Sequence, residues 1–227
     1  MPEADSLELY EKGLAQQRAG QLKAALQIYN VLLKRGANDA ALFVRSGECW
    51  EGLGDFGRAD EAYGAAITRD PDLDLARRRA AALALRASEI ARTAGQAATA
   101  DDLRHGAVRY LAGLGERLIA RGAFAEAEAA FRDASRIAPG EWSLQADLGR
   151  CLYEQGRFAA AERALRDALA LAPAEPLCHF HLGVLMERQD RRAEAESAFR
   201  QALALAPGLA PAAAGLARLG VPAQNPP

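Results

Sequence analysis

The residues best suited to chemistry in this sequence are Cys178, His179 and His181, which lie close together near the C-terminal end. Thiolate and imidazole are ligands that zinc and softer metal ions prefer, so this stretch is a candidate metal site. In a helix, however, residues two apart point to different faces, and the two histidines cannot bind one ion together. Zinc needs three or four ligands, and the only other histidine is His105. We therefore expect no metal site and no cofactor.

Two further cysteines, Cys49 and Cys151, are candidate nucleophiles. A cysteine nucleophile needs a nearby histidine and an orienting group, and neither cysteine has them close in sequence. Both occupy the same position of the repeat described below, where a small buried thiol is the expected role. Glycine-rich phosphate-binding loops and the GxSxG turn are also absent from the sequence. We expect a protein without catalytic residues.

Arg77, Arg78 and Arg79 form a run of positive charge that could contact an anion or a nucleic acid. Consecutive residues of a helix point about 100° apart, so the three side chains cannot form one patch, and a solvated face is the expected role. The whole chain has 28 Lys and Arg against 30 Asp and Glu, a formal net charge of -2, without a block of like charge. We expect no nucleic-acid partner.

Helices must position these residues, because the sequence repeats with a period of 34 residues. In the frame that makes Pro173 the 32nd residue of its repeat, the repeats begin at 6, 40, 74, 108, 142 and 176, with a partial one at 210. Small residues at fixed places let two helices approach closely, one large apolar residue fills the remaining space, and proline ends the second helix. The residues in register include Gly13, Gly20, Ala25 and Tyr29; Gly47, Gly54, Ala59, Tyr63 and Pro71; Gly115, Gly122, Ala127, Phe131 and Pro139; Gly149, Gly156, Ala161, Leu165 and Pro173; and Gly183, Ala195, Phe199 and Pro207, with Asp190 at the turn of the sixth repeat.

These residues resemble those of the tetratricopeptide repeat (TPR) family, in five of the repeats. The resemblance implies an all-α, right-handed superhelical solenoid. The expected organisation is two repeats at 6–73, a degenerate repeat at 74–107, three repeats at 108–209, a capping helix at 210–219 and a disordered tail at 220–227.

The degenerate repeat lacks the motif and contains a long apolar stripe at helical spacing. It predicts two long helices over 73–94 and 99–121, with Gly95 ending the first and Thr99 as the N-cap of the second. Because one weak interface can open in a repeat array, we also predict a hinge there.

The TPR resemblance implies that the first helix of each repeat lines a concave groove that binds a protein or peptide partner. We therefore predict a protein-interaction module, acting as a scaffold, in assembly, or as a chaperone-like adaptor. An accessory subunit of a modifying enzyme, such as a glycosyltransferase or methyltransferase, and a self-assembling homo-oligomeric scaffold are the alternatives. The groove residues that the resemblance implies are Tyr10, Gln17, Arg18, Glu48, Glu51, Arg78, Arg86, Arg109, Glu116, Arg150, Tyr153, Glu154, Phe180, Glu187 and Arg188.

Two further expectations concern partners and compartment. TPR co-chaperones hold the C-terminal carboxylate of a chaperone tail with lysine, asparagine and arginine, and these types are missing at the matching positions, apart from Arg79. The sequence has no apolar segment long enough for a membrane helix and no secretory signal. With only 3 scattered cysteines, it predicts a cytoplasmic protein that does not insert into membranes.

Overall fold

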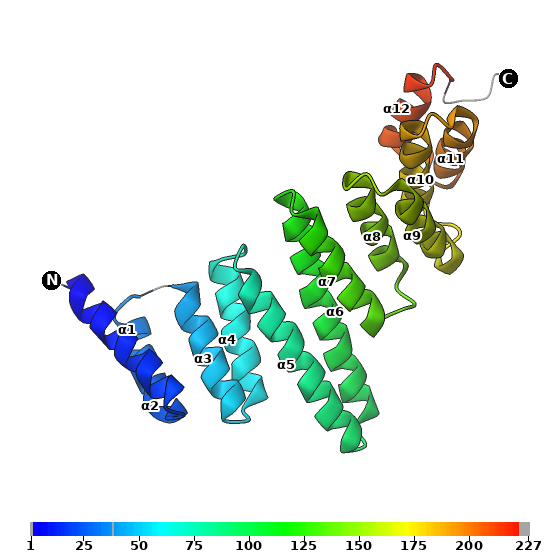
Figure 1. The fold of residues 1–227 in the computed structure, drawn as a ribbon. Helices are drawn as coiled ribbons and strands as arrows, with labels where there is room; N and C mark the ends of the chain where they lie inside the picture. The colour runs from blue at the N-terminus through cyan, green and yellow to red at the C-terminus, as the bar shows by residue number, and fades with distance from the viewer. Residues whose placement is uncertain (1, 38, 223–227) are drawn as a thin grey trace. The chain divides into compact units, whose positions relative to one another are not determined.

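The computed structural model describes residues 2–37 and 39–222, and over these residues the chain forms α-helices and no strands (Figure 1). The all-α repeat fold expected from the sequence is confirmed. In chain order the helices are α1 (Pro2–Arg18), α2 (Leu22–Lys34), α3 (Ala40–Gly52), α4 (Phe56–Arg69), α5 (Asp74–Thr93), α6 (Ala97–Ala120), α7 (Phe124–Ile137), α8 (Trp142–Glu154), α9 (Phe158–Leu171), α10 (Pro176–Arg188), α11 (Arg192–Leu205) and α12 (Ala210–Arg218).

Helix contacts divide the chain into two compact units, unit 1 at Met1–Leu114 and unit 2 at Gly115–Pro227. Within unit 1, α1 packs on α2 and α3 packs on α4; within unit 2, α8 packs on α9 and α10 on α11 (Figure 1). Each pair is one helical hairpin of the 34-residue period, and its two apolar faces form the core. The boundary between the units falls inside α6, the longest helix, so each unit is described separately.

The hairpins owe their close packing to a glycine on the first helix and a large residue on the second. A methyl group on Gly47 would lie 2.6 Å from the ring of Tyr63, and one on Gly183 would lie 2.6 Å from the ring of Phe199. Any side chain at these glycines would therefore push the helices apart. Phe199 is also pressed by Gly215 of α12, at the same distance of 2.6 Å. The terminal helix thus closes the core of unit 2.

The turns between paired helices depend on a residue in the left-handed region. Gly54 and Gly156 have φ values of 79° and 73°, which glycine adopts without steric cost. In the last hairpin this place is taken by Asp190, with φ of 58°. It is the only non-glycine residue with positive φ in the described part of the chain. Asp190 therefore carries some backbone strain.

The degenerate repeat contains the two long helices α5 and α6, close to the predicted ranges. Gly95 has φ of 76° and follows the end of α5, as expected. The predicted N-cap at Thr99 is wrong, because α6 already begins at Ala97. The backbone N–H of Gln96 bonds to the carbonyl of Ala91 at 2.9 Å, so the chain turns directly from one helix into the next. The predicted tail lies outside the described residues from 223 onward.

In unit 2, two ion pairs connect successive hairpins with the period of the sequence. Glu128 of α7 pairs with Arg157 at 2.7 Å, and Glu162 of α9 pairs with Arg191 at 2.7 Å. Both carboxylates are poorly exposed, at 5% and 14%. We call these two contacts the edge pairs. They connect the second helix of one hairpin to the turn that precedes the second helix of the next.

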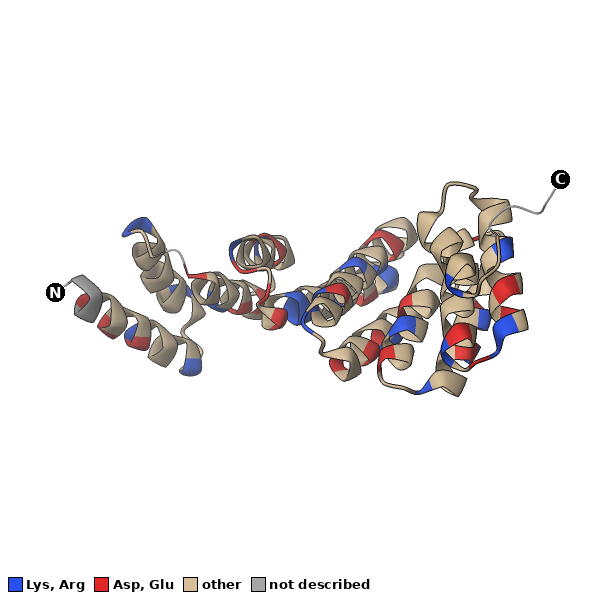
Figure 2. Ribbon diagram, turned by 90° about the horizontal axis from the view of Figure 1, so that it is seen from above, with Lys and Arg blue, Asp and Glu red and all other residues tan. Residues whose placement is uncertain are grey.

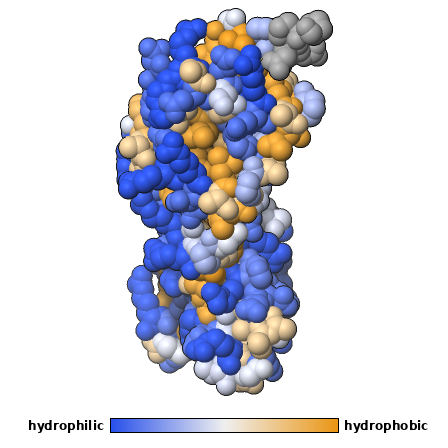
Figure 3. Space-filling model, turned by 90° about the vertical axis from the view of Figure 1, so that its right-hand side faces the viewer, coloured by the Kyte–Doolittle hydropathy of each residue, from blue (hydrophilic) through white to orange (hydrophobic). Residues whose placement is uncertain are grey.

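The surface of both units mixes the two signs of charge, as the alternation of Lys and Arg with Asp and Glu along the helices shows (Figure 2). On the face shown in Figure 3, hydrophilic side chains cover most of the surface, and apolar side chains appear in patches between them. None of the helices described is long and apolar enough to cross a membrane.

A candidate binding groove in unit 1

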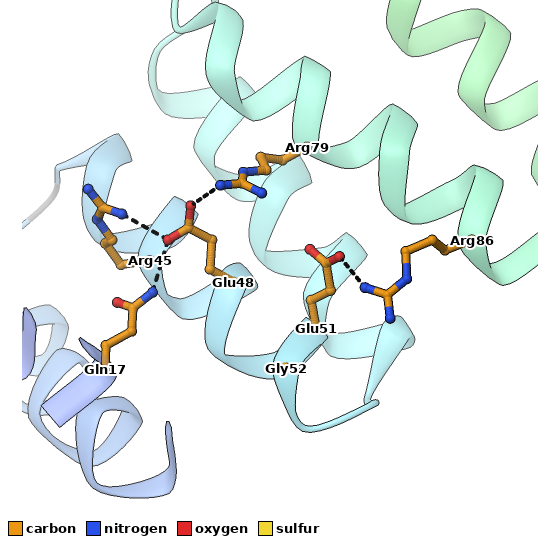
Figure 4. Close-up of a pocket in the computed structure, with 7 residues that line it drawn as sticks. All are labelled: Gln17, Arg45, Glu48, Glu51, Gly52, Arg79 and Arg86. Atoms are coloured by element: carbon orange, nitrogen blue, oxygen red, sulfur yellow. Dashed lines mark hydrogen bonds and ion pairs between the residues drawn. The ribbon is translucent and has the colours of Figure 1, made fainter. Parts of the chain in front are cut away.

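Polar side chains of α1, α3 and α5 surround a groove of about 360 Å³ in unit 1 (Figure 4). Its residues on α3 are spaced by three and four positions, and those on α5 by seven, which places each set on one helix face. We call it the unit 1 groove. It is lined by Gln17 of α1, Arg45, Glu48, Glu51 and Gly52 of α3, and Arg79 and Arg86 of α5.

Glu48 is at the centre of the hydrogen bonds in this groove. Arg45 approaches one of its carboxylate oxygens at 2.9 Å, and Arg79 approaches the other at 3.0 Å. The amide of Gln17 donates a third bond to it at 3.0 Å (Figure 4). The carboxylate is only 11% exposed, so these three donors from three helices satisfy a charge that is largely removed from water.

Glu51 has a similar role one turn further along α3. Arg86 of α5 pairs with one oxygen at 2.7 Å, and the hydroxyl of Tyr63 donates to the other at 3.0 Å. Burial raises the pKa of Tyr63, and the neighbouring Glu51 carboxylate adds to the effect. Tyr29 likewise donates to Gln17 at 2.7 Å. Two aromatic residues of the core therefore hold the groove side chains in place.

The three arginines remain accessible while they hold these carboxylates. Arg45, Arg79 and Arg86 are 39%, 47% and 60% exposed. A guanidinium has five N–H donors, and each contact above uses only part of that set. The remaining donors can bind a second carboxylate or a similar planar anion. With three guanidinium groups against two carboxylates, the groove has an excess of positive charge.

Among the residues implied for unit 1, Gln17, Glu48, Glu51 and Arg86 lie together in the groove. Tyr10 packs against the ring of Tyr29, with centroids 6.4 Å apart. The exposed side chains of Arg18 and Arg78 are not part of the groove lining, and Arg109 lines a different cavity.

Sequence reasoning missed Arg45 and Arg79, which line the same groove. Both occupy the sixth position of their repeats, which the family resemblance connects only with a chaperone-tail clamp. The spacing of three residues between Arg45 and Glu48 was the available signal for an ion pair on this face.

In unit 2, the residues predicted for a groove centre on Arg150. It pairs with Asp147 at 3.4 Å, and its Nε atom is buried without a hydrogen-bond partner among the described residues. Burial raises the pKa of Asp147, Arg150 opposes this, and Glu116 adds to it. Burial, and then the charge of Arg150, lower the pKa of His181.

The remaining residues predicted in unit 2 are mostly engaged in packing. Tyr153 stacks near Phe158 at 5.9 Å, and Phe180 packs on Phe199 at 6.1 Å. Glu187 pairs with Arg218 of α12 at 2.7 Å, which connects the last hairpin to the terminal helix. The two others in this unit, Glu154 and Arg188, are exposed.

The cysteines and histidines do not form a reactive centre in the part of the chain that is described. Cys49, Cys151 and Cys178 are unpaired and fully buried. Burial raises the pKa of these thiols to about 11, 12 and 11 respectively, opposite to an activated nucleophile. A ring nitrogen of His179 lies 2.9 Å from the carbonyl oxygen of Pro173. Among the described residues, no three metal-ligating side chains are grouped together.

Comparison with solved structures finds helical repeat proteins at low sequence identity. The structure of the APC/C hetero-tetramer Cut9–Hcn1 matches with 15% identity and a TM-score of 0.48, over 94% of this chain and 42% of that chain. This chain thus spans less than half the length of that protein. YrrB, a TPR protein with an unusual peptide-binding site, matches with 16% identity and a TM-score of 0.46, over 81% of this chain and 95% of that one.

A third structure, the first TPR of Spaghetti (RPAP3) bound to an HSP90 peptide, matches with 19% identity and a TM-score of 0.48. The match covers 50% of this chain and 90% of that chain. No curated protein matches the sequence significantly.

The family comparison agrees with the periodic pattern and the hairpins. One tetratricopeptide repeat model matches residues 118–179, and a second matches residues 176–209. These ranges contain α7 to α11, including the contact between Gly183 and Phe199 and both edge pairs. Residues 118–209 therefore match the tetratricopeptide repeat family, as the repeat pattern of the sequence predicts.

Proposed function

We propose that this chain is a protein-interaction module whose unit 1 groove binds an extended segment of a partner protein through acidic side chains. The observation that carries the proposal is the set of three accessible arginines around the largely buried Glu48 and Glu51. These carboxylates hold the guanidinium groups in place before a ligand arrives. A partner carboxylate would then bind without a large cost for ordering the arginines.

The mixed chemistry of the groove supports a protein segment as the ligand. A peptide offers backbone carbonyls and N–H groups that the carboxylates, the amide of Gln17 and the arginines can bind. The ring of Phe56 lies under Arg86 at 5.4 Å and keeps this guanidinium close to the surface of α4. The three buried, unpaired cysteines fit the reducing cytoplasm predicted from the sequence.

A phage-displayed library of random dodecapeptides tests the proposal directly. Wild-type protein is used for selection, and the variant Arg79→Glu/Arg86→Glu is used to identify peptides that depend on the groove. We expect the groove-dependent peptides to be enriched in Asp and Glu, and the double variant to weaken their binding by about tenfold or more. Fluorescence anisotropy of individual peptides, repeated at raised salt, gives the dissociation constants.

Arg78→Glu is the control, because it reverses the charge of one exposed neighbour that does not line the groove. It should leave the dissociation constants within about twofold. Selected peptides that bind the double variant as well as wild type, or that lack an excess of acidic residues, would contradict the proposal.

A further inference from the structure

A second cavity of unit 1, of about 510 Å³, lies between α4, α5 and α6. This volume is within the range of about 300–1,000 Å³ that is typical of ligand pockets. Its walls are largely apolar, with aromatic rings from α4 and α6 and small residues from all three helices. Its lining includes Phe56, Leu83, Ala84, Ala87, Gly106 and Tyr110.

This second cavity, which we call the α4–α6 pocket, is separate from the unit 1 groove. Arg79 and Arg86 of α5 face the groove, whereas Ala84 and Ala87 line the pocket. At about 100° per residue, Ala84 lies roughly 140° around the helix from Arg79, whereas Leu83, which also lines the pocket, lies about 40° from it. The two cavities therefore use adjacent faces of α5 and share no lining residue.

One glycine of the pocket wall, Gly106, has no internal packing role. Gly106 is buried in α6, yet a methyl group there would meet only the guanidinium of Arg109, at 4.0 Å. The hairpin glycines behave differently, since a methyl group on Gly47 would lie 2.6 Å from a ring. Glycine inside a helix is less favourable than alanine. The space beside Gly106 is left open within the chain and is available to a ligand.

The rim of the pocket is acidic. Asp60, Glu61 and Asp102 stand against the single guanidinium of Arg109. Asp60 accepts a hydrogen bond from the hydroxyl of Tyr110 at 2.9 Å, which ties the rim to the aromatic wall. Within the described residues, neither Glu61 nor Asp102 forms an ion pair, and all three carboxylates are exposed. The charge complement of this rim is cationic.

We propose that the α4–α6 pocket docks a segment of a second protein that has one large apolar side chain flanked by lysine or arginine. The apolar side chain fills the space beside Gly106, and the flanking cations face the carboxylates of Glu61 and Asp102. This site is additional to the unit 1 groove and differs from it in the charge that it selects. The chain would then bring together an acidic and a basic partner segment on adjacent faces of α5.

The same peptide library tests this site when Gly106→Leu is used as the counter-selecting variant. Leucine is a good helix former, so this variant keeps α6 and fills the pocket. We expect the peptides that bind wild type but not Gly106→Leu to share a large apolar residue next to Lys or Arg. Circular dichroism and urea unfolding confirm that the variant is folded. Peptides of the unit 1 groove should bind Gly106→Leu as they bind wild type, so failure of one site is distinguished from failure of the other.

Gly64→Leu is the matched control for Gly106→Leu. Gly64 is also inside a helix, a methyl group at this position would have nothing within 4 Å, and the residue does not line the pocket. The substitution should leave binding of the basic peptides unchanged. If Gly64→Leu abolishes binding as Gly106→Leu does, or if no peptide distinguishes wild type from Gly106→Leu, the proposal is wrong.

Charge reversal at the rim tests the choice of partner. Glu61→Lys/Asp102→Lys should weaken the selected basic peptides by about fivefold or more at low salt, and the loss should shrink at high salt. Selected peptides that are acidic, or that bind this variant with unchanged affinity, would overturn the assignment of a basic segment. Sedimentation of the wild type covers one further outcome, because a dimer that Gly106→Leu abolishes would make a second copy of the chain the occupant.

Discussion

Ion pairs connect successive hairpins in both units, but they lie at different places in the two units. In unit 1, Glu48 and Glu51 of α3 reach Arg79 and Arg86 of α5 across the groove. In α7 to α11 of unit 2, the edge pairs connect second helices, and they use Glu128 and Glu162. The ion pairs of unit 1 line the groove, so a ligand in the groove can contact them.

This difference couples binding and stability in unit 1 but separates them in unit 2. A ligand carboxylate in the unit 1 groove binds the remaining donors of the same guanidinium groups that hold α3 to α5. In unit 2, within the described residues, the edge pairs share no ion pair with Asp147 and Arg150, so we expect a change at one to leave the other in place. We expect substitutions in the two units to differ in whether they change affinity as well as stability.

The largest effect is expected from removal of an edge pair. Glu128→Ala deletes a 5% exposed carboxylate that accepts bonds from Arg157 and Gln155, and should lower the stability of unit 2 by about 2 kcal/mol. Trp142 is the only tryptophan of unit 2. Urea unfolding followed by its fluorescence, in a Trp50→Phe background, measures the change.

Binding of acidic peptides to the unit 1 groove should be the same in Glu128→Ala as in wild type. Glu126→Ala is the control on the same helix, because Glu126 is exposed, and it should change the stability by at most about 0.5 kcal/mol. Equal losses in the two variants would remove the distinction between the units.

A smaller loss of stability, with an effect on binding, is expected for Glu51→Gln. Its partner Arg86 is 60% exposed, so the substitution should cost unit 1 at most about 1 kcal/mol. Loss of this negative charge raises the net positive charge of the groove, which should outweigh the looser placement of Arg86 and strengthen binding of acidic peptides by about twofold to fivefold. Trp50 fluorescence in a Trp142→Phe background gives the stability, and anisotropy gives the affinity. An affinity that is unchanged or weaker would show that the groove does not couple peptide binding to the stability of unit 1.

The pH dependence of unit 2 provides a third comparison. Burial alone would raise the pKa of Glu128, but bonds from Gln155 and Arg157 and the charge of Arg132 outweigh it and lower the pKa. A lowered folded-state pKa means that the edge pair stabilises unit 2 above the unfolded value of about 4.3, and that this contribution is lost as the pH falls through the folded-state pKa.

Glu128→Gln should therefore be less stable than wild type at neutral pH, and the gap should close on acidification. The contribution of Asp147 to the pH dependence of stability has the opposite sign. Its raised pKa means that the protonated carboxyl favours the folded state, so this contribution is lost as the pH rises. Urea unfolding at several pH values, read from Trp142, measures the gap. A gap that stays constant down to the acid transition would contradict the assignment to Glu128.

The smallest effect is expected at the turn of the last hairpin. Asp190→Gly relieves the strain of a left-handed aspartate and should stabilise unit 2 by up to about 1 kcal/mol. Gly156→Asp makes the reverse change in the neighbouring turn of the same unit and should destabilise it. A loss of stability in Asp190→Gly would mean that the aspartate side chain contributes more than the backbone costs.

The fold could be predicted from the sequence because each hairpin repeats one local rule. The glycine at the position of Gly47 and the large residue at the position of Tyr63 each recur with a period of 34 residues. This pattern determines which helix faces meet. The unit 1 groove was harder to predict from the sequence, since its side-chain partners come from different repeats. The run Arg77 to Arg79 does not tell which of its members faces α3, and only the packing of α5 selects Arg79.

The edge pairs were readable in principle. Glu128 and Glu162 lie one period apart, as do Arg157 and Arg191, so aligned repeats would have suggested a recurring contact. The α4–α6 pocket had no such signal. It arises where the motif is lost, and glycine at 106 looks the same in sequence whether it serves close packing or open space.

The buried thiols can report on transient local opening of the hairpins. Cys49 is in unit 1, whereas Cys151 and Cys178 are in unit 2, and none is accessible in the closed state. A thiol reagent can modify each of them only while its hairpin is transiently open, and the rate of labelling then measures the free energy of that opening. Mass spectrometry of the labelled peptides would read the two units separately in one sample. A groove ligand that slows labelling of Cys49 alone would show, without any substitution, which part of the chain it holds closed.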